Sequence, residues 1–394
     1  MAMFRSTLLL LPLLLLLVNS CASHGSQAHN HRVVKFGGHH FPIGQGLKAS
    51  LSDNAGPWDG FKLLLDAKLG EVRAGMANLK MYLLQFGYIS SADAPPAGSS
   101  FSEEFDSITQ KAIQNYQRSF GLPVTGNLDL ATLTQMIIPR CGREDVINGT
   151  LLMLQNGFDS VPGTQHLGVQ HWSSFPGGRR WTKKNLTYAI NLSTISSGVS
   201  VVDTQNTIDK AFATWQAAIT LNFTRIMNIE TADIRISFDA LDHGDGNAFD
   251  GPLGVLAHAF APTDGRLHFD MEEYWTIDVK TATSSGSFDL LSVAIHEIGH
   301  ILGLEHSNFQ DAIMYPSISP LVAKQSLHAD DVAGVQALYE ADPKYTGSPV
   351  TEGLGSQSGA VASWDRMRTS EGMVLVVCMF MSLLVGRSLL PVIW

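Results

Sequence analysis

The sequence predicts an α+β fold in which a small three-helix domain precedes a domain with a mixed, twisted sheet and one long helix. Two observations predict it. Apolar residues recur at helical spacing in three stretches between residues 61 and 136. Beyond residue 180, short β-branched segments alternate with helical ones, which is typical of helices packed on a mixed sheet.

The first domain is expected to contain helices over residues 61–89, 105–120 and 128–136. Gly87 closes the first helix, and a turn with glycine and proline over residues 121–126 separates the second helix from the third. A connector rich in glycine, serine and proline, residues 147–178, follows this domain. In the second domain the expected elements are strands over residues 186–190 and 234–238 and helices over residues 203–219, 287–304 and 330–339.

The helix over residues 287–304, with Ser285 or Ser287 as its expected N-cap, leads into the motif HEIGHILGLEH at residues 296–306. His296 and His300 are four residues apart, so both imidazoles leave one face of the helix. Glu297 lies beside them, where it can act on a water molecule.

Gly303 can adopt the positive φ that ends a helix, and the resulting turn would return His306 as a third ligand. Three protein ligands leave one position open for water, as a hydrolytic zinc ion requires. Met314, in the following Ile-Met-Tyr-Pro segment, suits a turn beneath such a metal site.

A second set of metal-binding side chains precedes this helix. Three histidines and one aspartate suit a tetrahedral zinc with no open position: His243, Asp245, His258 and His268. Asp250, Asp270 and Glu273, together with loop carbonyls, would make an oxygen cage for calcium. Taken alone, the same residues also suit a polar glycine-rich loop with incidental histidines.

Composition and the chain ends point to the secretory pathway. The formal net charge is −10 and only 16% of residues are charged, which gives no basic footprint for nucleic acid. Residues 1–23 have the layout of a signal peptide, with an apolar run over residues 8–18. Four glycosylation sequons fit a secreted chain: Asn148, Asn185, Asn191 and Asn222. Of three cysteines, only Cys141 lies outside the apolar ends, either as a buried inert thiol or with a function of its own.

The chain resembles the matrix metalloproteinases, or matrixins, of the metzincin clan, and most closely their plant members. The resemblance covers residues 60–340. It rests on FGLPVTG at residues 120–126, Pro-Arg-Cys-Gly at residues 139–142, the segment 180–188, the metal loops and the zinc helix, all in the family's order. The family's hemopexin domain is not expected, because few residues follow the last helix.

The resemblance implies a role for each matching residue. His296, His300 and His306 would bind catalytic zinc, Glu297 would be the general base, and Met314 would form the Met-turn. The second cluster would bind structural zinc. The calcium ligands would be Asp250, Gly251, Leu253, Val255, Asp270 and Glu273, and a second calcium would use Asp233. Leu253 stands where the family usually has glycine, and the loop before His268 is shorter than in typical animal members.

The resemblance also implies a zymogen. Cys141 would bind the catalytic zinc in the precursor, and a salt bridge between Arg140 and Asp145 would shape the switch, although Glu144 stands where the family usually has proline. The expected parts are a signal peptide (1–23), a propeptide (24–170) with a peptidoglycan-binding-like helical domain (60–137) and a cysteine switch (139–146), a catalytic domain (171–341), a linker (342–360) and a removed C-terminal signal (361–394). The mature N-terminus is placed near residues 165–175.

The C-terminal tail is expected to signal a glycolipid anchor. Its apolar run over residues 373–386 is shorter than the roughly twenty residues that span a bilayer. Ser358 or Gly359 would be the attachment site. The alternative is a short membrane helix with Arg387 reaching the interface.

The expected function is that of a secreted zinc- and calcium-dependent endopeptidase, which cleaves extracellular proteins at the cell surface, apoplast or extracellular matrix after an activating protease removes the propeptide. Two alternatives stay open. One is a non-catalytic cell-wall or glycan-binding protein with a structural zinc site, and the other is a non-proteolytic zinc hydrolase that acts on a small molecule or a glycan.

Overall fold

The computed structural model describes residues 33–36, 39–42, 56–154, 173–174, 178–195 and 198–347. The expected signal peptide and C-terminal signal lie outside the described residues. In the described part of the chain, no helix is both long and apolar enough to cross a membrane. An antiparallel pair, β1 (Val33–Phe36) and β2 (His39–Pro42), comes first.

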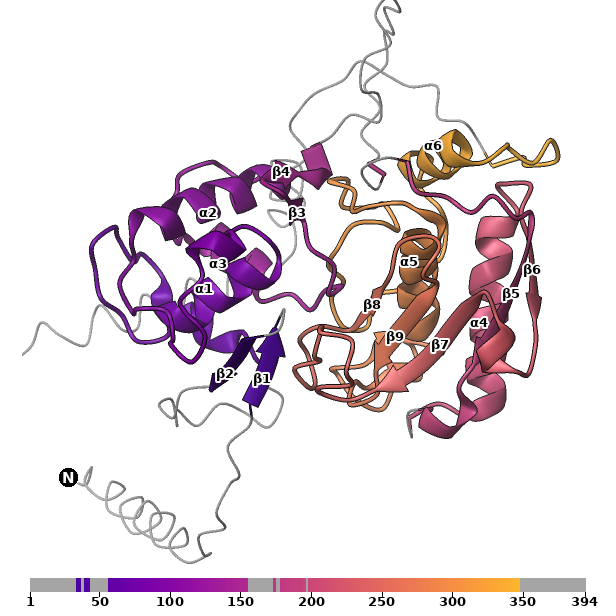
Figure 1. Cartoon of the computed structure of the whole chain (residues 1–394), viewed down its shortest axis with the longest axis horizontal. Helices are drawn as coiled ribbons and strands as arrows, with labels where there is room; N and C mark the ends of the chain where they lie inside the picture. The colour runs from indigo at the N-terminus through magenta and orange to yellow at the C-terminus, as the bar shows by residue number, and fades with distance from the viewer. Residues whose placement is uncertain are drawn as a thin grey trace, which may run out of the picture. The chain divides into compact units, whose positions relative to one another are not determined.

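The helical domain consists of α1 (Met76–Gln85), α2 (Ser107–Ser119) and α3 (Leu130–Met136), which lie together in Figure 1. Asp106 and Asp129 cap α2 and α3, and each accepts a hydrogen bond from a backbone N–H three residues on. Aromatic side chains fill the core, with Tyr82 between Phe86 and Tyr116. The second and third predicted helices are therefore present, close to their predicted bounds.

The first predicted helix is interrupted. Instead of one helix over residues 61–89, a 3₁₀-helix, η1 (Asp59–Leu64), is followed by turns before α1 begins. Asp66, Gly70 and Gly75 adopt φ values of +60°, +86° and +97°, which a right-handed helix excludes. The helical spacing of apolar residues continues across these turns in the sequence, because η1 and α1 both contribute side chains to the same core.

The predicted connector begins with a hairpin. Strands β3 (Val146–Ile147) and β4 (Thr150–Leu151) pair antiparallel, and η3 (Leu152–Leu154) follows. Asn148 and Gly149 form the two-residue turn with φ of +51° and +76°, as an Asn-Gly hairpin requires. Residues 155–172, which contain most of the expected processing region, lie outside the described residues.

The second domain is built on a five-stranded sheet with the strand order β6-β5-β7-β9-β8. Its strands are β5 (Asn185–Ile190), β6 (Asn222–Arg225), β7 (Ile234–Asp239), β8 (Ala257–Ala259) and β9 (Arg266–Asp270). All neighbours are parallel except β8, which pairs antiparallel with β9 and forms one edge. The sheet is therefore mixed, as predicted.

Two helices pack together beside this sheet, α4 (Val201–Gln216) and α5 (Leu290–Leu302) (Figure 1). Trp215 of α4 is fully buried, and its indole N–H donates to the Ile295 carbonyl of α5 at 2.8 Å. Every residue of α5 is buried, so this helix is a rigid support for the side chains that it presents.

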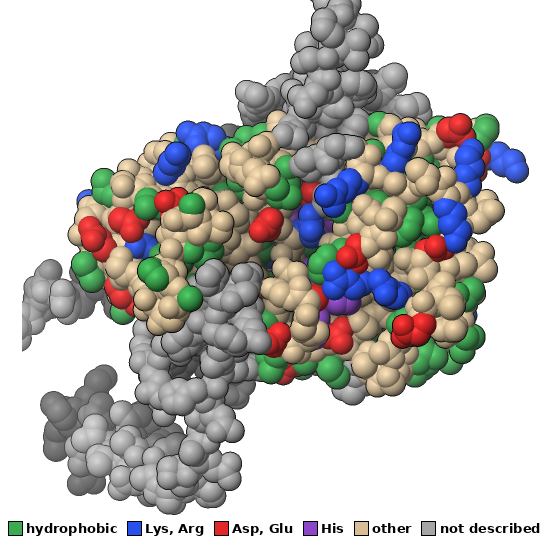
Figure 2. All heavy atoms as spheres, in the orientation of Figure 1, with side chains coloured by type: hydrophobic (Ala, Val, Ile, Leu, Met, Phe, Trp, Pro, Cys, Tyr) green, Lys and Arg blue, Asp and Glu red, His purple; other side chains and the backbone are tan. Residues whose placement is uncertain are grey.

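Helix α5 begins later than the sequence predicts. Its N-cap is Asp289, which accepts a hydrogen bond from the Ser292 N–H at 3.0 Å, and not Ser285 or Ser287. The residues before it form β11 (Phe288–Asp289), which pairs with β10 (Trp275–Thr276) and keeps them extended. The last helix, α6 (Ala329–Leu338), matches the prediction. On the face shown in Figure 2, basic and acidic side chains are interspersed.

Candidate metal centre

Helix α5 and the turn after it bring three histidines together. His296 and His300 lie one turn apart, with 4.9 Å between their ring centroids. Gly303 ends the helix with φ of +108°, and a Cβ there would lie 2.4 Å from the Arg179 carbonyl oxygen, so glycine is required. The His306 ring centroid then lies 5.4 Å from that of His296 and 4.9 Å from that of His300.

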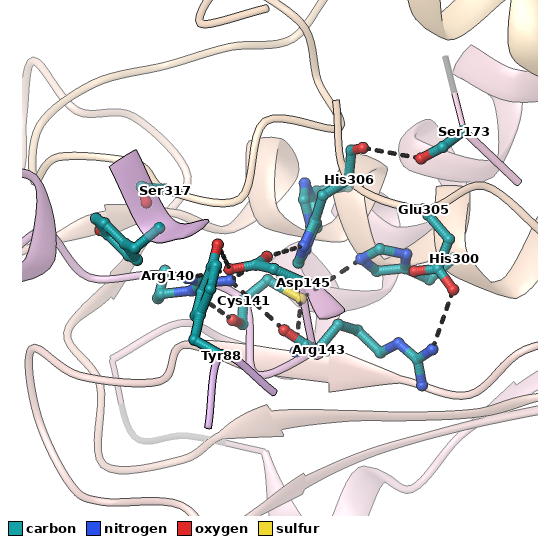
Figure 3. A network of polar contacts seen from close by, with 12 residues as sticks. Tyr88, Arg140, Cys141, Arg143, Asp145, Ser173, His300, Glu305, His306 and Ser317 are labelled. Carbon is teal, nitrogen blue, oxygen red and sulfur yellow. Dashed lines mark hydrogen bonds and ion pairs between the residues drawn. The ribbon is translucent and has the colours of Figure 1, made fainter. Parts of the chain in front are cut away.

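Cys141 completes this group. It lies in residues 139–146, the expected cysteine switch, which is called the switch segment below. One potential ligand atom from each of the four residues lies within 4.8 Å of the others, and Cys141 Sγ is 3.5 Å from His300 Nε2 (Figure 3). Nε2 of His296 and of His306 is buried without a hydrogen-bond partner in the described structure. Three imidazoles and one thiol, with orphaned buried nitrogens, form a donor set that fits zinc.

The ring orientation of each histidine is set by an acceptor at Nδ1. These acceptors are the Ile313 carbonyl at 2.7 Å from His296, the Leu304 carbonyl at 2.8 Å from His300 and Asp145 Oδ1 at 2.8 Å from His306. Since carbonyl and carboxylate oxygens only accept, Nδ1 carries the proton and Nε2 carries the lone pair. Burial lowers the pKa of all three histidines, to about 3 for His296, so the rings are neutral, as metal ligands must be.

Glu297 lies in the same space without being one of these donors. Its side chain is fully buried, and the only group that approaches its carboxylate among the described residues is the Cys141 thiol. Burial raises the pKa of Glu297 to about 8. It lines a small cavity together with Cys141 and His296. A carboxyl group with a pKa near neutrality and free lone pairs can accept and return a proton.

A methionine packs directly beneath the histidines. The Met314 sulfur would lie 2.2 Å from a Cβ on Gly299, so only glycine at this point of α5 permits the contact. Asp331 holds the methionine segment, because its carboxylate accepts hydrogen bonds from the N–H groups of Ile313 and Met314 at 2.9 and 3.0 Å. The sequence indicated Met314 but not Asp331, which lies in the first turn of α6.

Residues 139–142 lie between two extended segments of the second domain, with isolated bridges from Arg140 to Val255 and to Ser317. On one side Arg140 N donates to Gly254 O at 3.0 Å, and Leu256 N donates to Arg140 O at 2.9 Å. On the other side Cys141 N donates to Pro316 O at 2.9 Å. Backbone hydrogen bonds on both sides therefore hold residues 139–142 in place and keep the Cys141 sulfur at the histidines.

Arg140 and Asp145 form the predicted ion pair, and both are fully buried. Arg140 Nη1 and Nη2 each donate to one oxygen of Asp145, at 2.8 and 2.7 Å, and Tyr88 Oη donates at 2.8 Å (Figure 3). Burial would raise the pKa of Asp145, but the Arg140 guanidinium and His306 hold it well below its usual range. The carboxylate is ionised, and it joins the switch to a histidine of the metal centre.

A second ion pair was not indicated by the sequence. Arg143 Nη2 donates to Glu305 Oε1 at 3.3 Å (Figure 3). Glu305 is fully buried between Leu304 and His306, and burial raises its pKa to about 7. No spacing rule pairs residues so far apart in the chain, so only the folded structure could reveal this contact.

The other predicted cluster also assembles. The ligand atoms of His243, Asp245, His258 and His268 lie within 4.8 Å of one another. Asp245 Oδ2 is 3.1 Å from His243 Nε2, 2.8 Å from His258 Nε2 and 2.9 Å from His268 Nδ1. Burial lowers the pKa of His258 to about 4, whereas the histidines hold the pKa of Asp245 well below its usual range despite its burial. The set fits a tetrahedral zinc with no open position.

The predicted calcium residues surround one loop. Leu253 N donates to Glu273 Oε1 at 2.7 Å, and Val255 N donates to Asp250 Oδ1 at 2.8 Å. Asp270 Oδ2 and Glu273 Oε2 are buried and have no hydrogen-bond partner within the described part. Burial and the neighbouring carboxylates raise the pKa of Asp270 to about 7 and that of Glu273 to about 9. Crowded, partly orphaned carboxylates of this kind fit a cation such as calcium.

Two details bear on the calcium prediction. Leu253 has φ of +68°, so the loop demands the left-handed conformation that the family's glycine would favour. At the proposed second site, Asp233 accepts both hydrogen bonds of Lys183 Nζ, at 2.8 and 2.6 Å, and those of the Thr187 N–H and hydroxyl. The Lys183 ammonium thus supplies the positive charge beside Asp233.

The sequons fall on the surface or near it. Asn148 is exposed in the β3–β4 turn, and Asn191 is partly buried at the end of β5. Asn185 and Asn222 are exposed and lie opposite each other on β5 and β6, where Asn222 Nδ2 donates to Asn185 Oδ1 at 3.0 Å. The expected anchor sites, Ser358 and Gly359, lie outside the described residues.

Comparison with known proteins agrees with this architecture. Residues 180–340 match the family model of Matrixin, and residues 73–136 match that of the "Putative peptidoglycan binding domain". Metalloendoproteinase 1-MMP of Arabidopsis thaliana is 40% identical over 322 residues, which cover 81% of this chain and 84% of that protein.

Metalloendoproteinase 1 of Glycine max is 40% identical over 279 residues, 70% of this chain and 85% of that protein. Human Matrix metalloproteinase-20 is 38% identical over 267 residues, 66% of this chain and 48% of that protein. These relatives confirm the enzyme interpretation over the non-catalytic alternative. The chain belongs to the matrixin family and is a zinc metalloendopeptidase.

Proposed function

We propose that this endopeptidase is made as a latent, secreted precursor. In that precursor, Cys141 would occupy the coordination position that the attacking water needs at the catalytic metal. The observation that carries the proposal is the approach of Cys141 Sγ to 3.5 Å from His300 Nε2, inside the group of three histidines. Burial and the Glu297 carboxylate raise the pKa of the Cys141 thiol, whereas a cation beside the sulfur favours the thiolate.

The reaction centre would use the residues of α5 in distinct roles. His296, His300 and His306 would hold the metal through Nε2. A bound zinc acts as a Lewis acid and lowers the pKa of water to about 7. Glu297 would accept the proton of the attacking water and return it to the leaving amine, because its buried carboxylate faces the histidines and its one partner, the Cys141 thiol, leaves with the switch.

Removal of the switch segment would open a groove for substrate. The backbone groups that now bind residues 139–142, among them Gly254 O, Leu256 N and Pro316 O, would accept an extended peptide instead. The cavity beside Glu297 is lined by Val293, Ile313 and Ile318, so it favours an apolar substrate side chain next to the scissile bond. Extended segments of extracellular proteins are the proposed substrates, and a protease that cuts the connector is the proposed activator.

The remaining metal sites would stabilise the domain. His243, Asp245, His258 and His268 would hold a structural zinc, and the carboxylates of Asp250, Asp270 and Glu273 would hold calcium with carbonyls of Gly251, Leu253 and Val255. The geometry favours one calcium over two, since Lys183 engages the Asp233 carboxylate.

The precursor would enter the secretory pathway through residues 1–23, carry glycans at its sequons and be anchored at Ser358 or Gly359. A phosphatidylinositol-specific phospholipase should release it from intact cells. Protein that stays with the membrane and retains Trp394 would contradict the anchor.

The decisive test of the catalytic proposal is Glu297→Gln. We expect the variant to keep both zinc ions and its melting temperature while hydrolysis of a peptide library falls by at least about 10²–10⁴-fold, the usual contribution of a general base. Activated wild type is the reference, and metal content is measured on the same samples. Loss of one zinc equivalent, or retention of activity, would contradict the assigned role.

A further inference from the structure

The three histidines of the metal centre differ in the origin of their Nδ1 partners. The partners of His296 and His300 are the backbone carbonyls of Ile313 and Leu304, which belong to the catalytic domain itself. The partner of His306 is the side chain of Asp145, at 2.8 Å, which follows the switch cysteine. Processing of the connector leaves the first two contacts intact and removes the third.

The contact between His306 and Asp145 is built, not incidental. Both side chains are fully buried. Asp145 Oδ1 accepts from His306 Nδ1 and Arg140 Nη2, while Oδ2 accepts from Arg140 Nη1 and Tyr88 Oη. Arg140 and Tyr88 hold the carboxylate from the other sides, so its position does not depend on the imidazole alone (Figure 3).

An anionic acceptor at Nδ1 changes how the other ring nitrogen binds a metal. It fixes the tautomer and the ring orientation of the histidine. It also raises the basicity of Nε2, and a neutral carbonyl raises that basicity less. His306 Nε2 faces the centre and has no partner among the described residues. The residue that blocks the site and the residue that orients its third ligand are thus four positions apart in one propeptide segment.

We propose that Asp145 is a positioning residue for the third histidine, so that the propeptide assembles the metal centre as well as blocking it. The precursor then holds zinc more tightly than its four direct ligands alone would, and processing lowers the affinity. The inference rests on the proposed binding of zinc by the histidines. It goes beyond the proposed latency, which assigns Asp145 only the role of ion-pair partner to Arg140.

The test is a double-mutant cycle on the full-length precursor. All proteins carry Glu297→Gln to prevent self-cleavage, and the zinc dissociation constant is measured by competition with a chromophoric chelator. Asp145→Asn is introduced with Cys141 present and again with Cys141→Ser. We expect Asp145→Asn to weaken zinc binding about 10–100-fold in both backgrounds, the usual effect of losing such a partner.

The second background separates two explanations. If Asp145 acts only by shaping the switch loop, its effect must pass through the Cys141 sulfur and disappear in Cys141→Ser, which would overturn the proposal. Tyr88→Phe is the matched control, because it removes a hydrogen bond from the same carboxylate without touching His306. We expect it to lower the melting temperature of the precursor and to leave the dissociation constant within about twofold, well below the 10–100-fold effect of a lost imidazole partner.

A measurement without substitution at Asp145 covers the case in which Asp145→Asn does not fold. In ¹⁵N-histidine spectra of the zinc-loaded precursor, the ring N–H protons of His296, His300 and His306 should all be shifted downfield and protected from exchange. After processing, the His306 signal alone should lose protection. A protected His306 signal in the processed domain would overturn the proposal.

The outcomes also separate this inference from the proposed function. A precursor that binds no zinc at the histidines would defeat both. The inference alone would be defeated if the precursor binds zinc and, with Glu297 intact, becomes an active protease, but Asp145→Asn leaves its zinc dissociation constant unchanged.

Discussion

The two histidine clusters of this chain have similar donors but differ in where the fourth donor comes from. In the cluster of His243, His258 and His268, the fourth residue is Asp245, which lies on the same domain and contacts all three rings. In the cluster on α5, the fourth donor is Cys141, which follows the helical domain and belongs to the proposed propeptide. A site with four donors of its own is closed permanently. On the proposed function, a site whose fourth donor comes from the propeptide would open when that segment is removed.

This comparison predicts opposite effects when each fourth donor is removed. Cys141→Ser should make the precursor cleave peptides without an activator, at least about tenfold faster than the untreated wild type, since a ligand weakened by only ~1.4 kcal/mol shifts the equilibrium tenfold. Asp245→Ala should leave the precursor latent but lower its stability by about 2 kcal/mol or more, because the buried His258 and the partly buried His243 and His268 lose a charged partner.

Peptide hydrolysis, zinc content and thermal unfolding of the same three proteins test this pair. A latent Cys141→Ser precursor would show that the thiol does not close the site. An Asp245→Ala precursor that activates itself would show that the two clusters are not functionally separate.

The sequence predicted much of the active cluster because its geometry is local. The spacing of His296 and His300 on a helix, and Gly303 at its end, depend on a few neighbouring residues. The interrupted helix before α1 was not predicted, because Gly70 and Gly75 interrupt a pattern whose apolar residues still face one core.

Contacts between distant segments could not be predicted from spacing. The bonds from His306 to Asp145 and from Lys183 to Asp233 join residues 161 and 50 positions apart. They arise only when the switch segment or neighbouring strands pack against each other. The N-cap Asp289 was missed for a similar reason, since the β10–β11 pairing decides where α5 can begin.

The proposed calcium site extends the comparison, because the side chains that it contributes, Asp250, Asp270 and Glu273, are all carboxylates. Without a cation, burial and mutual repulsion raise the pKa of Asp270 to about 7 and of Glu273 to about 9. The unfolded chain releases these protons near pH 4, so it binds fewer protons than the folded state up to pH 9. Stability in calcium-free, zinc-containing buffer should therefore fall as the pH rises from about 5 to 9.

Excess calcium should remove this slope, because it favours the ionised carboxylates of the folded state. Melting temperatures across that pH range, with and without calcium, measure the effect. Asp270→Asn should flatten the calcium-free slope, whereas Asp264→Asn, at a half-exposed residue paired with Arg266, should not. Identical slopes with and without calcium would exclude this site as the calcium site.

The smallest expected effect concerns the second ion pair, which joins the proposed propeptide to the matrixin domain. Arg143 is 19% exposed and Glu305 is fully buried, so their bond is partly screened by solvent. Arg143→Gln should weaken the closed state by about 0.5–1 kcal/mol and raise spontaneous activation only two- to fivefold, roughly the factor that this energy allows. Cys141 still closes the site in this variant, so latency should persist.

Lys184→Gln is the control, because it breaks an exposed pair with Glu340 far from the switch and should leave the activation rate unchanged. The rate is followed as peptide hydrolysis by untreated precursor over time. An Arg143→Gln precursor as active as Cys141→Ser would mean that the ion pair, and not the thiol, holds the propeptide closed, and the contrast between the two clusters would then rest on the wrong residue.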